Sequence, residues 1–221
     1  MENLSEHELQ ELASQLSHPK GANGIATAKS MNVANDNMIR SVINQIDVFD
    51  TVNILEIGPG NGLHINYLFQ KNPNTKYIGI DISELMVQEA TELNSEFTNS
   101  GKAIFEWTDG EIIHKEENSI NAIFTVNTLY FWKNPNEYLQ EIFRVLKNGS
   151  QLILGFVPKS TMEKLPFSKY GFELYDNESV QNLLEEIGFK IDKIISETEE
   201  VLSNTGDKKI RTFTVIKALK N

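Results

Sequence analysis

Short apolar runs alternate with longer amphipathic segments through the middle of this 221-residue chain. The short runs are typical of buried strands, and the longer segments place their apolar residues on one face of a helix. The predicted strands comprise residues 52–57, 76–81, 103–107, 120–126 and 150–156. The predicted helices between them comprise residues 62–71, 83–97 and 135–147. Alternation of this kind builds a mostly parallel sheet with helices on both faces.

The first fifty residues carry helical patterns and no evident strand. Leucines at helical spacing predict a helix over residues 4–16, and a second apolar face predicts another from about residue 33 to 48. Proline, glycine and Asn-Gly signals within residues 18–24 predict a break and a turn between these helices. We therefore expect residues 1–50 to form a helical cap or lid of the same domain as residues 51–221.

The C-terminal part of the chain has a different pattern. A loop rich in aromatic residues is predicted at 157–176, and a helix at 177–187. Two strand-like runs, 189–197 and 210–218, flank a hairpin-type turn at 203–207. An antiparallel hairpin that closes an otherwise parallel sheet accounts for these runs. The predicted fold is therefore α/β, with seven strands in all.

Composition narrows the chemistry by exclusion. The chain has no cysteine, which excludes disulfides, thiolate catalysis and cysteine-ligated metal sites. Its four histidines lack a metal-ligand spacing, so no metal site is predicted. The net charge of −11 argues against binding through nucleic-acid phosphates. The sequence shows neither a signal-peptide pattern nor an apolar stretch near the roughly 20 residues of a membrane helix. We expect a cytoplasmic monomer or homodimer that binds neither nucleic acid nor a membrane.

A glycine-rich turn after the first central strand is the clearest candidate for a binding site. Gly58, Gly60 and Gly62 stand at alternate positions directly after this strand. Glycine adopts positive φ readily and lets a ligand approach without an intervening Cβ. The next strand ends at Asp81, whose carboxylate can accept hydrogen bonds from both hydroxyls of a ribose. Together the turn and the carboxylate predict a ligand that contains a nucleoside.

The residues around the turn favour one such ligand. Dinucleotide folds use G-x-G-x-x-G and place a pyrophosphate at the helix N-terminus. This chain instead has G-P-G-N-G, preceded by the acidic Glu56. A carboxylate near the site repels phosphate but suits an ammonium group. S-adenosyl-L-methionine has an ammonium group, a sulfonium and a ribose, and it has no phosphate.

Residues 50–157 resemble class I S-adenosylmethionine-dependent methyltransferases of the small-molecule type, close to the group that contains quinone-biosynthesis enzymes. Three stretches carry the resemblance: LEIGPGNG at 55–62, YIGIDIS at 77–83 and FRVLKNGS at 143–150. The third departs from the family's R-v-L-k-p-G-G at Asn148 and Ser150, which affects only a turn. The resemblance implies a Rossmann-like fold. It also implies in-line SN2 transfer of a methyl group from S-adenosyl-L-methionine to a small-molecule acceptor.

The resemblance also implies roles for individual residues. Glu56 would hold the ammonium end of the cofactor, Asp81 would accept from the ribose diol, and Ile82 would pack on adenine. Asp109 matches an acidic position against the adenine amino group, although an ordinary Asp-Gly turn is the alternative. Asn127 matches the position beside the sulfonium. The expected cofactor-binding residues are Glu56, Gly58, Pro59, Gly60, Gly62, Asp81, Ile82, Asp109, Gly110 and Asn127.

The acceptor is expected beyond the carboxyl end of strand 120–126, because ligands of such sheets lie there. The aromatic segment 128–132 follows this strand, and Tyr130 is the preferred catalytic residue on the substrate side; the alternative is that these rings are core. His64, after the glycine turn, is a weaker candidate for a base, since helix starts often carry polar residues without a catalytic role. The segments expected to select the acceptor are 18–35, which could also form a lid, 128–134 and 157–176.

Two other functions stay open. An NAD-dependent oxidoreductase would need the third-glycine spacing and a placed catalytic pair. A Y-x-x-x-K pattern at 67–71 resembles that of short-chain dehydrogenases, but it follows the glycine turn instead of lying near the fifth strand. A non-catalytic sensor or partner subunit that binds S-adenosyl-L-methionine would carry the same cofactor residues as an enzyme.

Overall fold

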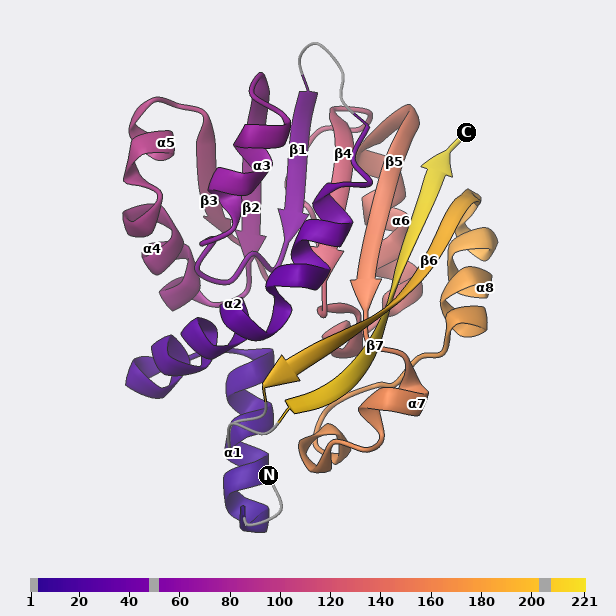
Figure 1. Cartoon of the computed structure of the whole chain (residues 1–221). Coiled ribbons are helices and arrows are strands. Elements are labelled where there is room, and N and C mark those ends of the chain that lie inside the picture. Colours follow the sequence, from indigo (N-terminus) through magenta and orange to yellow (C-terminus); the bar gives the residue numbers. More distant parts are fainter. Residues whose placement is uncertain (1–3, 48–51, 203–207) are drawn as a thin grey trace.

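A seven-stranded sheet forms the centre of the computed structural model, which describes residues 4–47, 52–202 and 208–221 (Figure 1). The strand order is β3-β2-β1-β4-β5-β7-β6. The first five strands pair in parallel, and β7 pairs antiparallel with both β5 and β6. The predicted Rossmann-like α/β fold with a C-terminal antiparallel hairpin is confirmed. The strands are β1 (Val52–Ile57), β2 (Thr75–Asp81), β3 (Ala103–Trp107), β4 (Ile120–Val126), β5 (Leu146–Phe156), β6 (Phe189–Leu202) and β7 (Lys208–Lys220).

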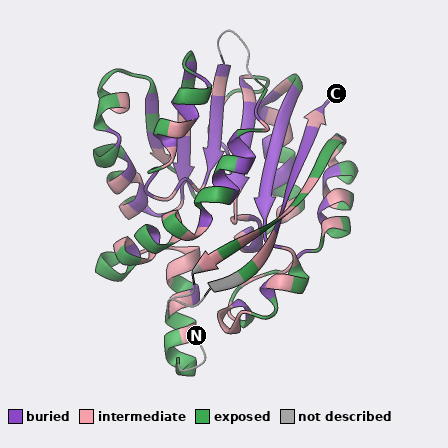
Figure 2. Ribbon diagram, viewed as in Figure 1, coloured by how far each residue is buried: buried purple, intermediate pink, exposed green. Residues whose placement is uncertain are grey.

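Helices cover both faces of this sheet: α2 crosses in front of it, and α6 lies behind it (Figure 1). The central strands are consequently buried along most of their length, which Figure 2 shows as mostly purple. Such two-sided burial explains why these strands read as apolar runs instead of alternating patterns. The helices are α1 (Glu6–Ser17), α2 (Gly21–Ile43), α3 (Ile65–Lys71), α4 (Glu84–Leu93), α5 (Ser95–Asn99), α6 (Pro135–Val145), α7 (Lys159–Met162) and α8 (Asn177–Ile187), with 3-10 turns η1 (Leu129–Phe131) and η2 (Pro166–Lys169).

The parallel register brings the loops after β1, β2 and β4 together. Ile57 at the end of β1 lies beside Ile80 of β2 and Thr125 of β4. The backbone N–H of Gly58 continues this pairing by donating to the Ile80 carbonyl at 2.8 Å. The glycine turn, Asp81 and the segment after β4 therefore meet at one edge of the sheet.

The N-terminal region corrects one prediction. Helix α2 begins at Gly21, about twelve residues earlier than expected, so the turn predicted from Asn23-Gly24 is wrong. Gly24 lies inside the helix, where an added Cβ would stand 2.8 Å from the backbone carbon of Pro19. The glycine therefore permits close packing of α2 against the preceding segment. The break predicted between the two N-terminal helices is present, after α1.

Several further boundaries differ from the prediction, among them the starts of β5, at Leu146 instead of 150, and of α3, at Ile65 instead of 62. The helix expected over 83–97 is divided into α4 and α5, because the Asn94 side chain donates to the carbonyls of Ala90 and Gly62. The expected loop 157–176 contains α7 and η2. Strands β6 and β7 extend well beyond the predicted runs, as a two-stranded ribbon whose residues are partly exposed. The hairpin turn predicted at 203–207 lies outside the described residues.

Candidate functional site

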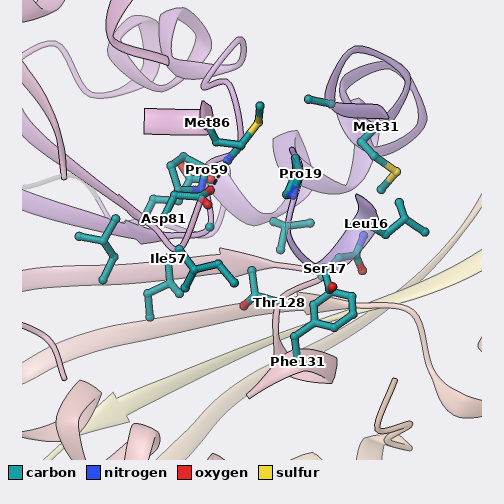
Figure 3. Close-up of a pocket in the computed structure, with 18 of the residues that line it drawn as sticks. Leu16, Ser17, Pro19, Met31, Ile57, Pro59, Asp81, Met86, Thr128 and Phe131 are labelled. Carbon is teal, nitrogen blue, oxygen red and sulfur yellow. Dashed lines mark hydrogen bonds between the residues drawn. The ribbon is translucent and has the colours of Figure 1, made fainter. Parts of the chain in front are cut away.

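A cavity of about 240 Å³ lies where the loops after β1, β2 and β4 meet. Ile57, Pro59 and Asp81 stand on its sheet side, and Pro19 and Met31 of the N-terminal segment stand across from them (Figure 3). The cavity is thus enclosed between the carboxyl edge of the sheet and the α1–α2 region. This is the position where open α/β sheets bind ligands.

The three glycines of the turn have different surroundings, although each has a positive φ of 56° to 70°. A Cβ on Gly58 would stand 2.5 Å from the Thr128 side chain, so this glycine lets the loop after β4 approach. A Cβ on Gly60 would meet no atom within 4 Å, and Gly60 lines the cavity. Gly62 instead faces Ile65, Asn94 and Phe105, away from the residues that line the cavity. Only the position of Gly60 leaves room for a ligand at the backbone.

Asp81 is buried in the cavity wall and is held by two backbone donors. Its Oδ2 accepts from the Gly60 N–H at 3.1 Å, and its Oδ1 accepts from the Ser83 N–H at 2.9 Å. Burial raises the pKa of this carboxyl to about 6, although both hydrogen bonds favour the charged form. Each oxygen retains a lone pair. The ionised carboxylate can therefore accept hydrogen bonds from a vicinal diol in the cavity. Ile82, the next residue, also lines it.

Glu56 forms a buried polar cluster with two neighbours. Its Oε2 accepts from the Tyr77 hydroxyl at 2.5 Å and from Nε2 of His64 at 2.8 Å. Burial and the adjacent Glu56 carboxylate raise the pKa of Tyr77 well above its ordinary value. Nε2 of His64 is occupied by Glu56, which leaves Nδ1 as the atom of this ring that a ligand or proton could reach.

Three residues that line the cavity carry a buried polar atom without a hydrogen-bond partner among the described residues. These atoms are Nδ1 of His64, Nε1 of Trp132 and the hydroxyl of Tyr138. Buried polar atoms cost free energy when they are unpaired. A ligand with both polar and apolar parts therefore fits this cavity. The donor set of S-adenosyl-L-methionine matches it, because Glu56 suits the ammonium group and Asp81 suits the ribose.

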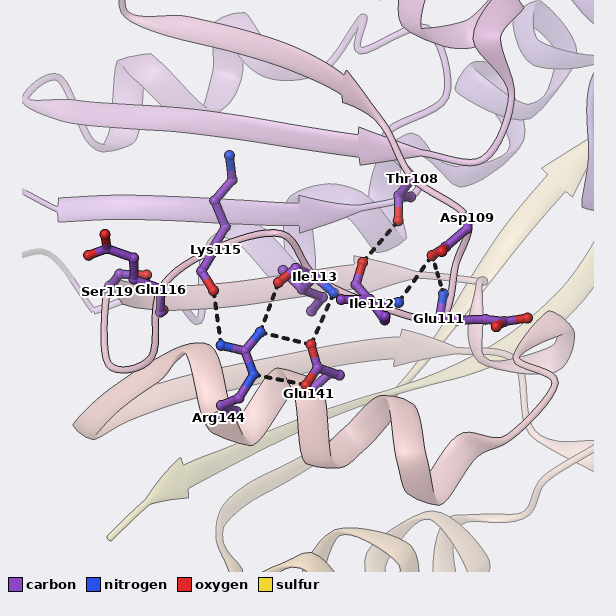
Figure 4. Close-up of polar contacts among 10 residues, drawn as sticks. All are labelled: Thr108, Asp109, Glu111, Ile112, Ile113, Lys115, Glu116, Ser119, Glu141 and Arg144. Atoms are coloured by element: carbon purple, nitrogen blue, oxygen red, sulfur yellow. Dashed lines mark hydrogen bonds and ion pairs between the residues drawn. The ribbon is translucent and has the colours of Figure 1, made fainter.

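Asp109 and Gly110 lie at the edge of the same cavity, after β3. The Asp109 carboxylate is exposed and accepts from the backbone N–H groups of Glu111 and Ile112 at 2.9 and 3.1 Å (Figure 4). These hydrogen bonds lower the pKa of Asp109. The contacts are those of an ordinary Asp turn. Its expected role toward adenine stays a prediction.

Arg144 holds in place the segment that follows this turn, a role that was not predicted from the sequence. Its guanidinium donates to the carbonyls of Lys115 and Ile113 at 3.0 and 2.9 Å and pairs with Glu141 of its own helix (Figure 4). Arg144 belongs to the FRVLKNGS stretch. The sequence alone indicates no such contact, because the partner carbonyls lie about thirty residues away from Arg144 in the sequence.

Asn127 follows β4 with φ of 58°, an unusual backbone conformation for a residue other than glycine. Its N–H donates to the Gly155 carbonyl at 2.9 Å, and its Oδ1 accepts from the Tyr130 hydroxyl at 3.1 Å. Asn127 lines the cavity described above. Local backbone strain of this kind is often found where a site must be held in place.

Tyr130 is placed to position other groups. Its hydroxyl accepts from the Val157 N–H at 2.6 Å and lies 3.1 Å from both the Val157 carbonyl and Oδ1 of Asn127. Burial raises the pKa of Tyr130 well above its ordinary value, which disfavours its use as a base.

The ring of Tyr130 lines a second cavity, of about 560 Å³, which lies beside the first. The two cavities share several walls, among them Met31, Asn127 and Phe131.

The N-terminal segment closes the first cavity through two polar contacts that the sequence did not predict. The Ser83 hydroxyl donates to the Pro19 carbonyl at 2.7 Å, and Nδ2 of Asn32 donates to Oδ1 of Asn61 at 2.8 Å. Met31 and Asn32 both line the cavity. Residues 18–35 therefore form one wall of the site. Their proposed movement as a lid stays a prediction.

Residues 55–154 match the family model described as "Methyltransferase domain". The predicted resemblance to class I S-adenosylmethionine-dependent methyltransferases is confirmed. The match covers the strands and loops that form the first cavity, and the chain is also similar to methyltransferases of known structure. Within the described residues, no group of three or more metal-binding side chains is present, and no helix is long and apolar enough to cross a membrane.

Similar proteins act on different acceptors. A tRNA U34 carboxymethyltransferase of Helicobacter pylori (strain Shi470) is 25% identical over 65% of this chain and 58% of its own length. A malonyl-[acyl-carrier protein] O-methyltransferase of Marinomonas sp. is 25% identical over 64% of this chain and 49% of its own. The chain thus spans about half the length of these curated relatives.

A solved structure supports the fold over most of the chain. A chain of the complex between the Haloferax volcanii methyltransferase activator Trm112 and a methyltransferase has a TM-score of 0.75 at 14% identity. The match covers 89% of this chain and 94% of that one. At this identity the likeness concerns the fold, and the acceptor must be inferred from the site itself.

Proposed function

We propose that this protein transfers a methyl group from S-adenosyl-L-methionine to a small-molecule acceptor. One observation carries the proposal: the cavity with two buried carboxylates opens beside a second cavity, and the two share Asn127 and Phe131. A donor in the first cavity and an acceptor in the second would meet at these shared residues. A sensor that binds the cofactor alone has no need of the second cavity.

The cofactor supplies a methyl group already activated on a sulfonium. The protein's residues have the tasks of binding and orientation. Ionised Asp81 would accept from the ribose hydroxyls, and Glu56 with Nδ1 of His64 would hold the ammonium end. Gly60 would leave the backbone open to the methionine part. The Tyr130 hydroxyl would fix the Asn127 amide beside the reacting centre.

Alignment of the two reactants can account for much of the rate. Holding a nucleophile in line with the transferring group converts a bimolecular step into a unimolecular one, an effect worth about 7–11 kcal/mol in favourable cases. The α1–α2 region would exclude water from this centre. A general base is required only if the acceptor loses a proton in the transition state.

A small acceptor is favoured over a nucleic acid by charge. The chain carries 31 acidic against 20 basic residues, so a polyanion would be repelled. The second cavity, proposed here for the acceptor, is also enclosed by α1, α2 and the segment that contains α7 and η2. We further propose a cytoplasmic monomer or homodimer, in which residues 1–50 cap the domain formed by residues 51–221.

Two measurements test the proposed function. Calorimetric titration should show binding of S-adenosyl-L-methionine and S-adenosylhomocysteine and none of NAD; binding of NAD alone would contradict the proposal. Incubation with S-adenosyl-L-methionine labelled in its methyl group, together with a panel of small acceptors, should transfer the label. Tight cofactor binding without transfer to any acceptor class would favour the sensor.

A further inference from the structure

The second cavity, called here the acceptor cavity, has mostly apolar walls. It lies between the N-terminal helices, the loop after β4, the α7–η2 segment and the outer part of the β6–β7 hairpin. Leu12 comes from α1, Val157 and Met162 from the segment after β5, and Val201 from β6. Side chains from four distant parts of the sequence thus enclose one apolar space of about 560 Å³. Such a space binds apolar surface by removing it from water.

Four aromatic rings stand together in its wall. Phe131 and Phe172 have ring centroids 4.6 Å apart, and Tyr130 and Phe167 lie 5.8 and 5.6 Å from Phe172. All four residues line the cavity. Clustered ring edges and faces favour a planar, aromatic or conjugated ligand over a flexible chain, because offset and edge contacts add to the burial of area.

Two charged residues line the cavity within the described part of the chain, Arg211 and Lys164. Lys164 is exposed to solvent, where water screens its charge. Arg211 is nearly buried, and Glu199 occupies its guanidinium: Nη2 and Nε lie 2.5 and 2.9 Å from Oε1 of Glu199. The same guanidinium donates to the Asn35 side chain. The Glu199 side chain is 7% exposed, so its negative charge is held close to the cavity.

Glu199 has a consequence for the choice of acceptor. An anionic acceptor would ordinarily pair with the Arg211 guanidinium, but this cation is already matched by a carboxylate of the protein. A second anion in the cavity would find the Arg211 charge already neutralised and would lose its hydration without an unpaired buried cation in return. Binding of an uncharged ligand does not require this loss of the hydration of a charge.

We propose that the acceptor is an uncharged, planar hydrophobic molecule, and that Glu199 excludes anionic analogues by neutralising Arg211. The inference rests on the proposed function, since the acceptor cavity is productive only beside the cofactor. The acceptor's nucleophilic atom would point to Asn127, where the two cavities meet, and its ring would lie among the four aromatic side chains. Glu199 is thus a specificity-determining residue for the transfer.

Two fluorescent probes with one skeleton test the inference without any methyl transfer. N-phenyl-1-naphthylamine is uncharged, and 8-anilinonaphthalene-1-sulfonate adds a single sulfonate. With the protein saturated by S-adenosylhomocysteine, we expect the uncharged probe to bind about tenfold more tightly or better, because the sulfonate finds no unpaired buried cation. Equal affinity of the two probes would overturn the charge-exclusion inference.

The variant Glu199→Gln keeps the shape of the side chain and removes its charge. It should raise the affinity for the sulfonate probe about tenfold and change the affinity for the uncharged probe by less than about twofold. The double variant with Arg211→Gln removes both charges and should lose this gain. An unchanged sulfonate affinity in Glu199→Gln would show that Glu199 does not select the ligand.

A cavity-filling variant locates the probe. Ala26 lines the cavity from the exposed side of α2, so Ala26→Trp should weaken binding of the uncharged probe. Ala22→Trp, on the same helix and outside the lining, is the matched control. Probe binding unaffected by Ala26→Trp would overturn the assignment of the cavity. Calorimetry with S-adenosylhomocysteine on each variant separates this result from failure of the proposed function, in which the wild-type protein itself would not bind the cofactor product.

Discussion

At the scale of single residues, Asp81 connects protonation with ligand binding. Its pKa is about 6 in the ligand-free protein because burial opposes its charge. A ribose diol donates hydrogen bonds to the ionised form. We therefore expect the affinity for S-adenosylhomocysteine to be constant above about pH 7 and to fall by up to about tenfold per pH unit below 6. Calorimetric titrations from pH 5 to 8 would measure this dependence.

The contribution of Asp81 to the stability of the fold should depend on pH in the opposite direction from its contribution to ligand binding. Its pKa in the folded state is raised above the unfolded value of 3.8, so the folded protein binds more protons between about pH 4 and 6. The contribution of Asp81 to the free energy of unfolding thus falls as pH rises through this range, by at most about 3 kcal/mol. Urea unfolding of wild type and Asp81→Asn isolates it as their difference, with exposed Asp36→Asn as control. A difference that is independent of pH would contradict the raised pKa.

The residue scale also shows how far the sequence could define the site. The order of residues predicted Asp81, Glu56 and Gly60, because a motif fixes their distance from the ends of two strands. The cavity brings all three to its wall. Gly62 belongs to the same motif but packs behind the turn. Spacing alone does not distinguish its packed surroundings from the open surroundings of Gly60. The partnership of Glu199 with Arg211 depends on the register of a hairpin, which the sequence could not supply.

At the scale of elements, α6 controls the loop after β3 through Arg144. Arg144→Ala would leave the carbonyls of Ile113 and Lys115 without their donor, at a cost of about 1–3 kcal/mol in the free energy of unfolding. The loop carries Asp109 and Gly110 at the cavity edge, so the affinity for S-adenosylhomocysteine should fall as well. Arg144→Lys should restore little, because an ammonium cannot reproduce the planar fork.

Urea unfolding and calorimetry on the same samples measure both effects of Arg144. Arg40→Ala is the matched control: its pair with Asp36 lies exposed on α2, and such pairs contribute about 0.5 kcal/mol. If Arg144→Ala lost stability and kept full affinity, the loop would hold its shape without this anchor. Loss of affinity in Arg40→Ala as well would point to a general effect of charge.

Elements differ in how well the sequence predicted them, for physical reasons. Strands β1 and β4 have the predicted bounds, because two-sided burial imposes an apolar run that ends where burial ends. Strand β3, at the edge of the sheet, also has the predicted bounds, although its buried and exposed residues alternate. The start of α2 was missed because Gly24 ordinarily indicates a turn, and its close contact with Pro19 is tertiary. The outer part of β6 was missed because it begins with the three polar residues Thr198, Glu199 and Glu200, which a ribbon that leaves the sheet permits.

At the scale of the whole molecule, the N-terminal helices have two different relations to the domain. The second half of α2 buries Met38, Val42 and Ile43 completely or nearly so against the sheet. Helix α1 has Ala13 as its buried residue and contributes instead to the walls of both cavities. The hairpin is tied to α2, since Arg211 donates to the Ala34 carbonyl at 2.6 Å. We therefore infer that α2 belongs to the cooperatively folding core, whereas α1 mainly forms walls of the two cavities.

Two truncations test this division. Removal of residues 1–17 should leave a protein with one cooperative thermal transition and weakened binding of S-adenosylhomocysteine, because the cavity walls formed by Leu16 and Ser17 are lost. Removal of residues 1–46 should abolish the transition. Each fully buried aliphatic side chain contributes about 1.5–3 kcal/mol, so three of them represent much of a total stability of about 5–15 kcal/mol.

Circular dichroism during heating, with and without S-adenosylhomocysteine, distinguishes the outcomes. A cooperative transition in the longer truncation would mean that residues 47–221 fold alone and that the cap is a separable unit. Undiminished binding by the shorter truncation would mean that α1 does not form part of the site. The expected pattern, a folded protein with weaker binding and then an unfolded one, follows from the burial of α2 and the placement of α1 around the two cavities.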